Sequence, residues 1–258
     1  MPLRPTDAEH IRHLSFFRAS SDATFDQAIA GAFLQKFPAG TTLLMEGDSV
    51  DFLYILLEGS VELGAGWKSK DTTLAILRPV STFILAAVVL DADALMTAVT
   101  LERSEILMVP GESLRRAMKQ DAEFCFAVSE ELSGCYRGLV RSIKNHKLRD
   151  STERLANYLL TQRARQGGKV EIVLPHEKRV LASLLGMTPE NLSRAFLKLQ
   201  AQGVTVDGAR VRLEKVSALE RLARPSPLID NHFAQPRNEQ GKAHTERQKG
   251  LLDGNGGA

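Results

Sequence analysis

Three polar side chains near the C-terminal end of the chain, Glu190, Ser193 and Arg194, have the chemistry to bind the edges of DNA bases. An arginine can donate two hydrogen bonds to guanine O6 and N7, a glutamate can accept one from cytosine N4, and a serine can serve either partner. Spacings of three and four residues place all three on one face of a helix. We call these three residues the reading face, and we predict that it enters the major groove.

The surrounding residues predict the two helices that would hold the reading face. Apolar side chains recur every three or four residues in both helices, at Val180, Leu181, Leu184, Leu185, Leu192, Ala195, Phe196 and Leu199. Gly186 suits a turn with positive φ, Thr188 can cap the second helix, and Pro189 suits its first position. This is the layout of a helix-turn-helix, although two amphipathic helices that only pack together would show the same pattern.

Two further features favour DNA binding. Residues 204–213 alternate apolar and polar side chains around Asp207 and Gly208, which predicts a hairpin and therefore a winged helix-turn-helix. Residues 1–136 carry 11 Lys and Arg against 19 Asp and Glu, whereas residues 137–224 carry 18 against 8. A basic block at the helix-turn-helix is expected of a protein that neutralises phosphates. We therefore expect further DNA contacts from Thr188, Lys178, Arg179 and Lys198.

Composition argues against several other classes of protein. The chain has 258 residues, of which 43% are hydrophobic, so it can form two modest cores. It has neither an apolar run long enough to span a membrane nor a secretory segment, so we expect a soluble cytoplasmic protein. The two cysteines, Cys125 and Cys135, lack metal-ligand spacing, and no catalytic triad or ligand cluster is evident. We therefore expect neither an enzyme nor a metal site.

The N-terminal half predicts mainly strands. Short apolar runs separated by Gly40, Gly47, Gly59 and Pro79 predict a small antiparallel barrel or roll. The predicted strands are 42–45, 52–57, 61–63, 73–77, 98–101 and 105–109. The predicted fold class is therefore α+β, with an antiparallel β-roll before the winged helix-turn-helix.

A long helix is predicted between the two halves, because residues 121–147 contain no proline. Residues at alternating spacings of four and three follow the seam of a two-stranded coiled coil, which predicts a homodimer. The predicted dimer interface consists of Val128, Leu132, Cys135, Leu139 and either Ser142 or Ile143. A helix packed on its own roll is the alternative, because so few repeats do not establish a coiled coil.

These elements, in this order, resemble the Crp/Fnr family of bacterial transcription regulators. Three segments resemble the roll of the cyclic-nucleotide-binding superfamily: Pro38-Ala39-Gly40, Glu46-Gly47-Asp48 and the run from Leu53 to Val61. The resemblance extends from about Phe16 to Leu222. The implied partners are double-stranded DNA, a second copy of the chain and RNA polymerase. We interpret the protein as an activator, although the sequence leaves repression open.

The resemblance also implies the domain boundaries. A sensor roll is expected at residues 1–120, a dimerisation helix at 121–147 and the DNA-binding domain at 148–224. Residues 225–258 are polar and contain few large apolar side chains, so we interpret them as a disordered tail.

The residues at the family's ligand-binding positions indicate which effectors this chain could bind. Members that bind cAMP carry a Gly-Glu pair and an Arg-Ser pair, and the places of these pairs are taken here by Leu85-Ala86 and Met96-Thr97. Because a buried phosphate needs a cation, we expect no tight binding of cAMP or cGMP. No cysteine precedes Cys125, so we also expect no iron-sulfur cluster of the kind used by oxygen sensors.

An apolar effector pocket facing the long helix is the remaining expectation. It comprises Phe83, Ile84, Leu85, Val88, Val89, Leu90, Leu95 and Met96, although such residues can equally fill a core. The pattern is similar to the dissimilatory nitrate respiration and nitric-oxide-responsive branch of the family, which implies haem as a candidate cofactor. The candidate axial ligands are His10, His13, Met45, Met96 and His146.

The reading face is similar to that of the oxygen-sensing branch. The element Glu190-Asn-Leu-Ser-Arg194 matches the Glu-x-x-Ser-Arg pattern of that branch, which implies a TTGAT half-site and the palindrome TTGAT-N4-ATCAA. Pro189 stands where cAMP-dependent members carry arginine, so a TGTGA half-site is not expected. A ligand-independent regulator, in which the roll is only a dimer scaffold, is the alternative function.

Overall fold

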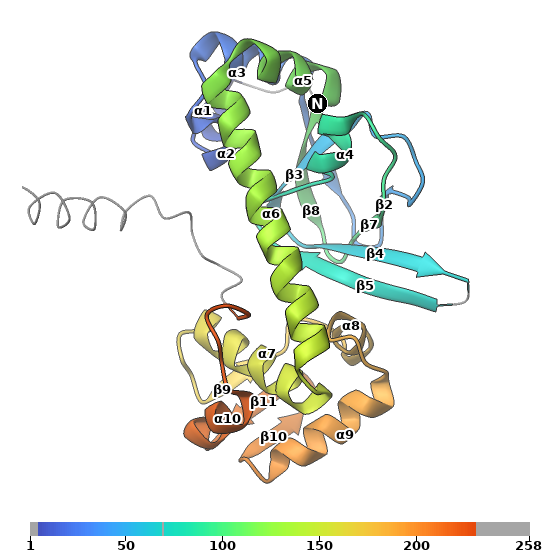
Figure 1. Ribbon diagram of the computed structural model, residues 1–258, viewed down its shortest axis with the longest axis vertical. Coiled ribbons are helices and arrows are strands. Elements are labelled where there is room, and N and C mark those ends of the chain that lie inside the picture. The colour runs from blue at the N-terminus through green and yellow to red at the C-terminus, as the bar shows by residue number, and fades with distance from the viewer. Residues whose placement is uncertain (1–4, 69, 231–258) are drawn as a thin grey trace, which may run out of the picture.

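The computed structural model describes residues 5–68 and 70–230 (Figure 1). A β-rich part and a helical part lie at opposite ends, and one long helix runs between them (Figure 1). The β-rich part begins with the short helices α1 (Pro5–Arg12), α2 (Ser15–Arg18) and α3 (Asp22–Ala28). Its strands are β1 (Phe33–Phe37), β2 (Thr42–Leu44), β3 (Phe52–Glu58), β4 (Val61–Trp67), β5 (Lys70–Leu77), β6 (Ser81–Phe83), β7 (Thr97–Thr100) and β8 (Ser104–Pro110).

The strands form two antiparallel sheets, so the predicted β-roll and the α+β fold class are confirmed. The strand orders are β1-β8-β3-β6 and β2-β7-β4-β5. Apolar side chains of both sheets share one core, which includes Leu53, Ile55, Val61 and Ile106 at 0% exposure. Strands β1 and β6 were not predicted, and β4 and β5 form a longer hairpin than expected. Gly64 and Gly66 explain the second difference, because glycine weakens a strand pattern.

Two helices, α4 (Leu85–Leu90) and α5 (Gly111–Gln120), complete the roll before the long helix α6 (Ala122–Leu148). Helix α6 has 27 residues and is therefore about 40 Å long. Its N-terminal cap is Asp121, which accepts hydrogen bonds from the backbone N–H groups of Phe124 and Ser21. A hydrogen bond from the Thr24 side chain, followed by those two backbone bonds, lowers the pKa of Asp121 to about 2. This carboxylate therefore fixes the start of α6 against α3.

The two halves of α6 have different environments. Phe124 and Val128 are fully buried in the roll core, and Leu132 packs against the same core. Cys135, Leu139 and Ile143 are exposed, as a helix-pairing surface requires in a single chain. The prediction that Val128 lies in the dimer seam is therefore wrong. The physical reason is that the first turns of α6 pack on α5 and α2, and an apolar spacing cannot show which neighbour covers it.

The helical part contains the predicted helix-turn-helix and wing. Its elements are α7 (Ser151–Arg165), β9 (Glu171–Val173), α8 (Lys178–Leu184), α9 (Pro189–Gln200), β10 (Val204–Asp207), β11 (Arg210–Leu213) and α10 (Val216–Ala223). Strands β10 and β11 pair antiparallel around Gly208, which has a φ of 58°. Strand β9, which was not predicted, adds a third strand beside β11. A second core, separate from that of the roll, holds these elements together.

The segment after α10 corrects another prediction. Residues 225–230 fold back on the end of α6, where the carboxylate of Asp230 pairs with the guanidinium of Arg149 through both oxygens. The Arg149 side chain is 6% exposed, so this pairing supplies the counter-ion that a buried charge needs. The predicted disordered tail therefore cannot begin at residue 225. Residues 231–258 lie outside the described residues.

None of the helices in the described ranges is both long and apolar enough to cross a membrane.

The different environments within α6 predict unequal costs of truncation. Val128→Ala should lower the free energy of unfolding by about 2 kcal/mol, because it leaves a cavity in the roll core. Phe126→Ala is the matched control, since Phe126 lies two residues away and is 62% exposed. Urea unfolding followed by circular dichroism measures both changes, and we expect less than about 0.5 kcal/mol for the control. Equal effects would contradict the assignment of Val128 to the core.

Candidate nucleic-acid interface

Helix α9 holds the reading face outward. Its buried side chains, Leu192, Ala195, Phe196 and Leu199, lie in the second core, where α9 contacts both α7 and α8. Glu190, Ser193 and Arg194 are all exposed, as the helical spacing predicts. The amphipathic pattern therefore has the expected orientation, with the polar face toward solvent.

The start of α9 organises the polar groups. Thr188 is the cap, and its hydroxyl oxygen accepts a hydrogen bond from the backbone N–H of Asn191 at 3.3 Å. A hydrogen bond from the Thr188 side chain, followed by a backbone bond and the charge of Arg194, lowers the pKa of Glu190. Glu190 therefore stays an ionised acceptor at neutral pH. The Arg194 guanidinium donates to Asn191 Oδ1 at 3.3 Å, and the Ser193 hydroxyl donates to the carbonyl of Pro189 at 3.0 Å.

The turn between α8 and α9 strongly favours glycine at position 186. Gly186 has a φ of 61°, and a Cβ atom there would lie 2.6 Å from Cδ2 of His146. The guanidinium of Arg154 donates to the carbonyls of Leu185 at 2.8 Å and Gly186 at 3.3 Å. It also donates to the carbonyl of Arg149 at 2.7 Å. The turn is therefore fixed to the junction of α6 and α7, a role of Arg154 that no local sequence pattern indicated.

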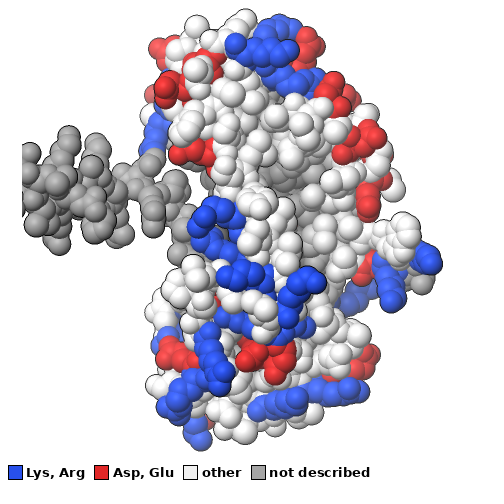
Figure 2. All heavy atoms as spheres, in the orientation of Figure 1, with Lys and Arg blue, Asp and Glu red and all other residues white. Residues whose placement is uncertain are grey.

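Exposed basic side chains lie on the helix that carries the reading face and on its partner helix. Lys178 and Arg179 are exposed at the start of α8, and Lys198 is exposed near the end of α9. Figure 2 shows Lys and Arg side chains over much of the lower, helical part of the molecule and also at the top and at the hairpin of the β-rich part, where Asp and Glu side chains are spread. The structure thus brings the predicted cationic residues onto one domain, where they can neutralise phosphates.

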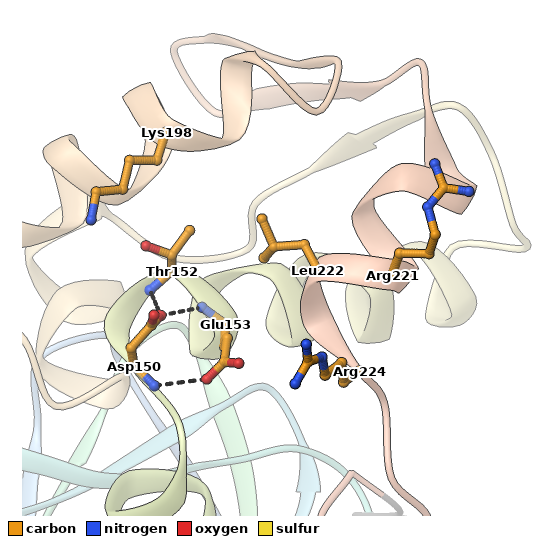
Figure 3. Close-up of a pocket in the computed structure, with 7 residues that line it drawn as sticks. All are labelled: Asp150, Thr152, Glu153, Lys198, Arg221, Leu222 and Arg224. Atoms are coloured by element: carbon orange, nitrogen blue, oxygen red, sulfur yellow. Dashed lines mark hydrogen bonds between the residues drawn. The ribbon is translucent and has the colours of Figure 1, made fainter.

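A groove continues this basic surface between α7, α9 and α10 (Figure 3). It has a volume of about 390 Å³ and is lined by Asp150, Thr152, Glu153, Lys198, Arg221, Leu222 and Arg224. The two acidic side chains form a capping box. Asp150 accepts from the N–H groups of Thr152 and Glu153 at 2.8 Å, and Glu153 accepts from the N–H of Asp150 at 2.9 Å. The lining therefore holds three cationic side chains against two carboxylates, and both carboxylates already accept hydrogen bonds from the start of α7.

The predicted effector residues are packed rather than open. Phe83, Ile84, Leu85 and Val88 are at most 8% exposed, and the Phe83 ring stacks on Tyr54 with centroids 5.1 Å apart. Met96 is half-buried against the same core. The region also contacts the long helix, since the Thr82 hydroxyl donates to Glu131 Oε1 at 2.6 Å. These side chains therefore fill a core, which was the alternative interpretation of the sequence.

Two of the predicted pocket residues, Leu90 and Leu95, are instead 75% and 79% exposed. Arg115 explains the position of Leu90, because it closes the end of α4 by donating to the carbonyl of Val88 at 2.8 Å and pairing with Asp91 at 2.9 Å. The short helix then ends with Leu90 facing solvent. The predictions that Leu90 and Leu95 line the pocket are wrong.

The candidate haem ligands lie in different parts of the molecule, except that Met45 and Met96 flank the paired strands β2 and β7. His13 and Met45 are exposed, and His146 lies against Gly186 at the opposite end of α6 from the roll. The side chain of His10 lies outside the described residues, and only Met96 packs on the core of the roll. Among the described residues, no group of three or more His, Cys, Asp or Glu side chains could hold a metal ion. Among the described side chains, no candidate histidine lies in the core of the roll.

A contact between the two domains bears directly on α8. Helix α8 packs against β5, and the backbone N–H of Thr73 in β5 donates to the Ser183 hydroxyl at 2.7 Å. Next to this contact, burial followed by the charge of Arg78 lowers the pKa of His176 to about 4. The charge of Glu102 raises the pKa of His176, and the charge of Arg165 lowers it further. His176 is therefore neutral at physiological pH. The contact between Thr73 and Ser183 joins the hairpin of the roll to the first helix of the helix-turn-helix.

Two family models match the chain. The model for the cyclic nucleotide-binding domain matches residues 34–121, and the model for the Crp-like helix-turn-helix domain matches residues 153–222. The global nitrogen regulator of Nostoc sp. is 24% identical over 210 residues, which cover 76% of this chain and 93% of that protein. The CRP-like cAMP-activated global transcriptional regulator of Mycobacterium tuberculosis is 23% identical, covering 73% of this chain and 87% of that protein.

Solved structures show the same fold. FixK2 from Bradyrhizobium japonicum superposes with a TM-score of 0.65 at 20% identity, covering 76% of this chain and 98% of that chain. The c-di-GMP-responsive global regulator CLP of Xanthomonas campestris gives 0.64 at 20% identity, covering 75% and 99%. The arrangement of roll, long helix and helix-turn-helix is therefore shared with these structures.

The half-buried His176 predicts a pH dependence of stability. The unfolded chain binds a proton on this imidazole near pH 6.5, whereas the folded chain resists protonation until about pH 4. Stability contributed by the neutral form is therefore present above pH 6.5 and is lost as the pH falls toward 4. His176→Gln should reduce this loss. Urea unfolding of both proteins between pH 4.5 and 7 measures it, and identical slopes would show that His176 is not protected from protonation.

Proposed function

This chain is a Crp/Fnr-family DNA-binding transcription regulator, and we propose that it binds a palindromic operator as a homodimer through α9. The single observation that carries the proposal is the exposure of Glu190, Ser193 and Arg194 on one capped helix within a basic domain. An N-terminal helix face of this kind is what a helix-turn-helix presents to base edges. Because DNA of a bacterial cell lies in the cytoplasm, the proposal includes a cytoplasmic location.

The proposed half-site is TTGAT. Its support is the Glu-x-x-Ser-Arg pattern of the reading face, which resembles the oxygen-sensing branch of the family. Arg194 would donate to O6 and N7 of the guanine, and Glu190 would accept from N4 of the cytosine paired with it. The low pKa of Glu190 supports this role, since an ionised carboxylate can only accept. Lys178, Arg179 and Lys198 would contact phosphates on either side.

The dimer is proposed to form through the second half of α6. Large apolar side chains there are exposed, including Tyr136 at 67%, Leu139 at 64% and Ile143 at 55%. A contiguous apolar stripe of this kind on a helix marks an interaction surface. Pairing of two α6 helices would relate the two α9 helices by a two-fold axis, as a palindrome with half-sites about 34 Å apart requires.

The similar proteins respond to different effectors, since one is cAMP-activated and another responds to c-di-GMP. In this chain the cAMP-binding Glu and Arg are replaced by Ala86 and Met96, so we propose that any effector is a small molecule other than cAMP. The tight packing of Leu85 and Val88 favours a second candidate function, a regulator whose roll is a scaffold and needs no ligand. Haem and a response to nitric oxide have no support among the described side chains.

RNA polymerase as a partner and activation as the outcome rest on the family resemblance alone. They complete the proposal, because a bound regulator changes transcription only through the polymerase or by blocking it.

Binding to the duplex TTGAT-N4-ATCAA tests the proposal. Purified full-length protein should bind it in the nanomolar range and at least about 1,000-fold more tightly than a scrambled duplex at the same salt concentration. Fluorescence anisotropy without added ligand, and then with cAMP, measures both affinities. Full affinity without a ligand supports the scaffold function, and equal affinity for both duplexes would overturn sequence-specific binding.

The guanine contact can be tested at Arg194. Arg194→Ala should cost about 1 to 3 kcal/mol per half-site and remove the preference for guanine, because two hydrogen bonds to the base are lost. Arg194→Lys is the matched control, since it keeps the charge but not the bidentate geometry. It should retain binding to scrambled DNA and keep part of the guanine preference, because an ammonium group can still donate to O6 or N7. Full guanine discrimination in Arg194→Ala would contradict the assigned role.

The dimer surface can be tested at Leu139. Leu139→Glu should produce monomers, because it places a charge in each half of an apolar interface. Affinity for the full palindrome should fall by about 100-fold or more, since two half-sites no longer bind as one unit. Leu90→Glu, at a 75% exposed position on the roll, is the control and should remain dimeric. Sedimentation velocity separates the two results, and a dimeric Leu139→Glu protein would exclude this surface.

A further inference from the structure

Helix α9 carries one apolar side chain on its otherwise polar outer face. Leu197 is 61% exposed, whereas the other apolar residues of the helix, such as Leu192 and Leu199, are buried in the core. A single exposed leucine is ordinary on a protein surface. What distinguishes Leu197 is its position relative to the reading face.

The helical geometry places Leu197 at the centre of that face. It follows Glu190 by seven residues, or about 700° at about 100° per residue, and so lies within about 20° of Glu190 around the axis. It is four residues after Ser193 and three after Arg194, the two spacings that make helix neighbours. A major groove that follows α9 for two turns from the start of the reading face therefore also receives Leu197.

The next residue shows that this orientation is specific. Lys198 lies about 100° further around the helix and lines the groove between α9, α7 and α10 (Figure 3). Its ammonium group is therefore placed at the side of the helix, where a phosphate would pass. The two neighbours thus have different expected partners, a base edge for Leu197 and the sugar-phosphate backbone for Lys198.

Base edges offer one apolar group in the major groove, the C5-methyl group of thymine. We propose that Leu197 is a specificity-determining residue that packs on a thymine methyl group in each half-site. This inference rests on the proposed DNA binding of α9. It adds a preference for thymine over cytosine, which lacks the methyl group, at a position beyond the reach of the hydrogen bonds from Glu190 and Arg194.

Deoxyuridine provides the test, because it differs from thymidine only by the C5-methyl group. The operator is the best-bound palindrome selected by wild-type protein from random duplexes. Each symmetric pair of thymines is then replaced by deoxyuridine in turn. We expect one pair at which wild-type affinity falls by about fourfold per half-site, the factor that corresponds to about 0.8 kcal/mol for one buried methyl group.

Two variants assign that effect to a residue. Leu197→Ala should bind the thymine operator more weakly than wild type and should not respond to deoxyuridine at that pair. Lys198→Ala, the matched control on the adjacent residue, should bind both operators more weakly by the same factor, with a shallower salt dependence. Both side chains are exposed, and thermal unfolding checks that both variants fold like the wild type.

The outcomes separate this inference from the proposed function. If wild-type protein selects no sequence, the proposed operator binding fails. If it selects a palindrome whose binding is insensitive to deoxyuridine at every pair, or that contains no thymine, the role of Leu197 is overturned while operator binding stands. A Leu197→Ala protein that responds to deoxyuridine like wild type would overturn it as well.

Discussion

The guanidinium of Arg154 holds the turn on which the orientation of the reading face depends. It joins carbonyls at the end of α8 to the carbonyl of Arg149, at the junction of α6 and α7. On the other side of the turn, His146 of α6 leaves no space for a side chain on Gly186. The direction of α9 is therefore set by contacts with α6 and α7, not by α9 alone.

The roll reaches the helix-turn-helix by two routes within one chain. One runs along α6, whose start is fixed by Asp121 and whose end carries His146 and Arg149. The other is the β4–β5 hairpin, which contacts α8 through Thr73 and Ser183. Because both routes end on the same helix pair, a rearrangement in the roll that moves either one changes the orientation of α9. An effector can shift that orientation only by binding one arrangement more tightly than the other.

Local patterns predicted the elements that carry the proposed function. The helix pair, the cap at Thr188 and the hairpin at Gly208 follow from spacing and turn chemistry, which depend on neighbouring residues in the chain. The sequence could not predict which surface covers a given apolar residue. Val128 and Leu139 both occupy seam positions of the heptad, yet one lies in the roll core and the other is exposed. The contacts of Arg154 likewise join residues distant in sequence, so its sequence signal was only a positive charge.

The ion pair between Arg149 and Asp230 has a consequence for biosynthesis. The roll and α6 leave the ribosome before residue 230 does. During that part of translation the Arg149 guanidinium lacks its ion pair with Asp230. The junction of α6 and α7 therefore gains its ion pair with Asp230 only after residue 230 has emerged from the ribosome. In a nascent chain the roll can therefore fold before the junction of α6 and α7 is complete. The two domains then mature one after the other.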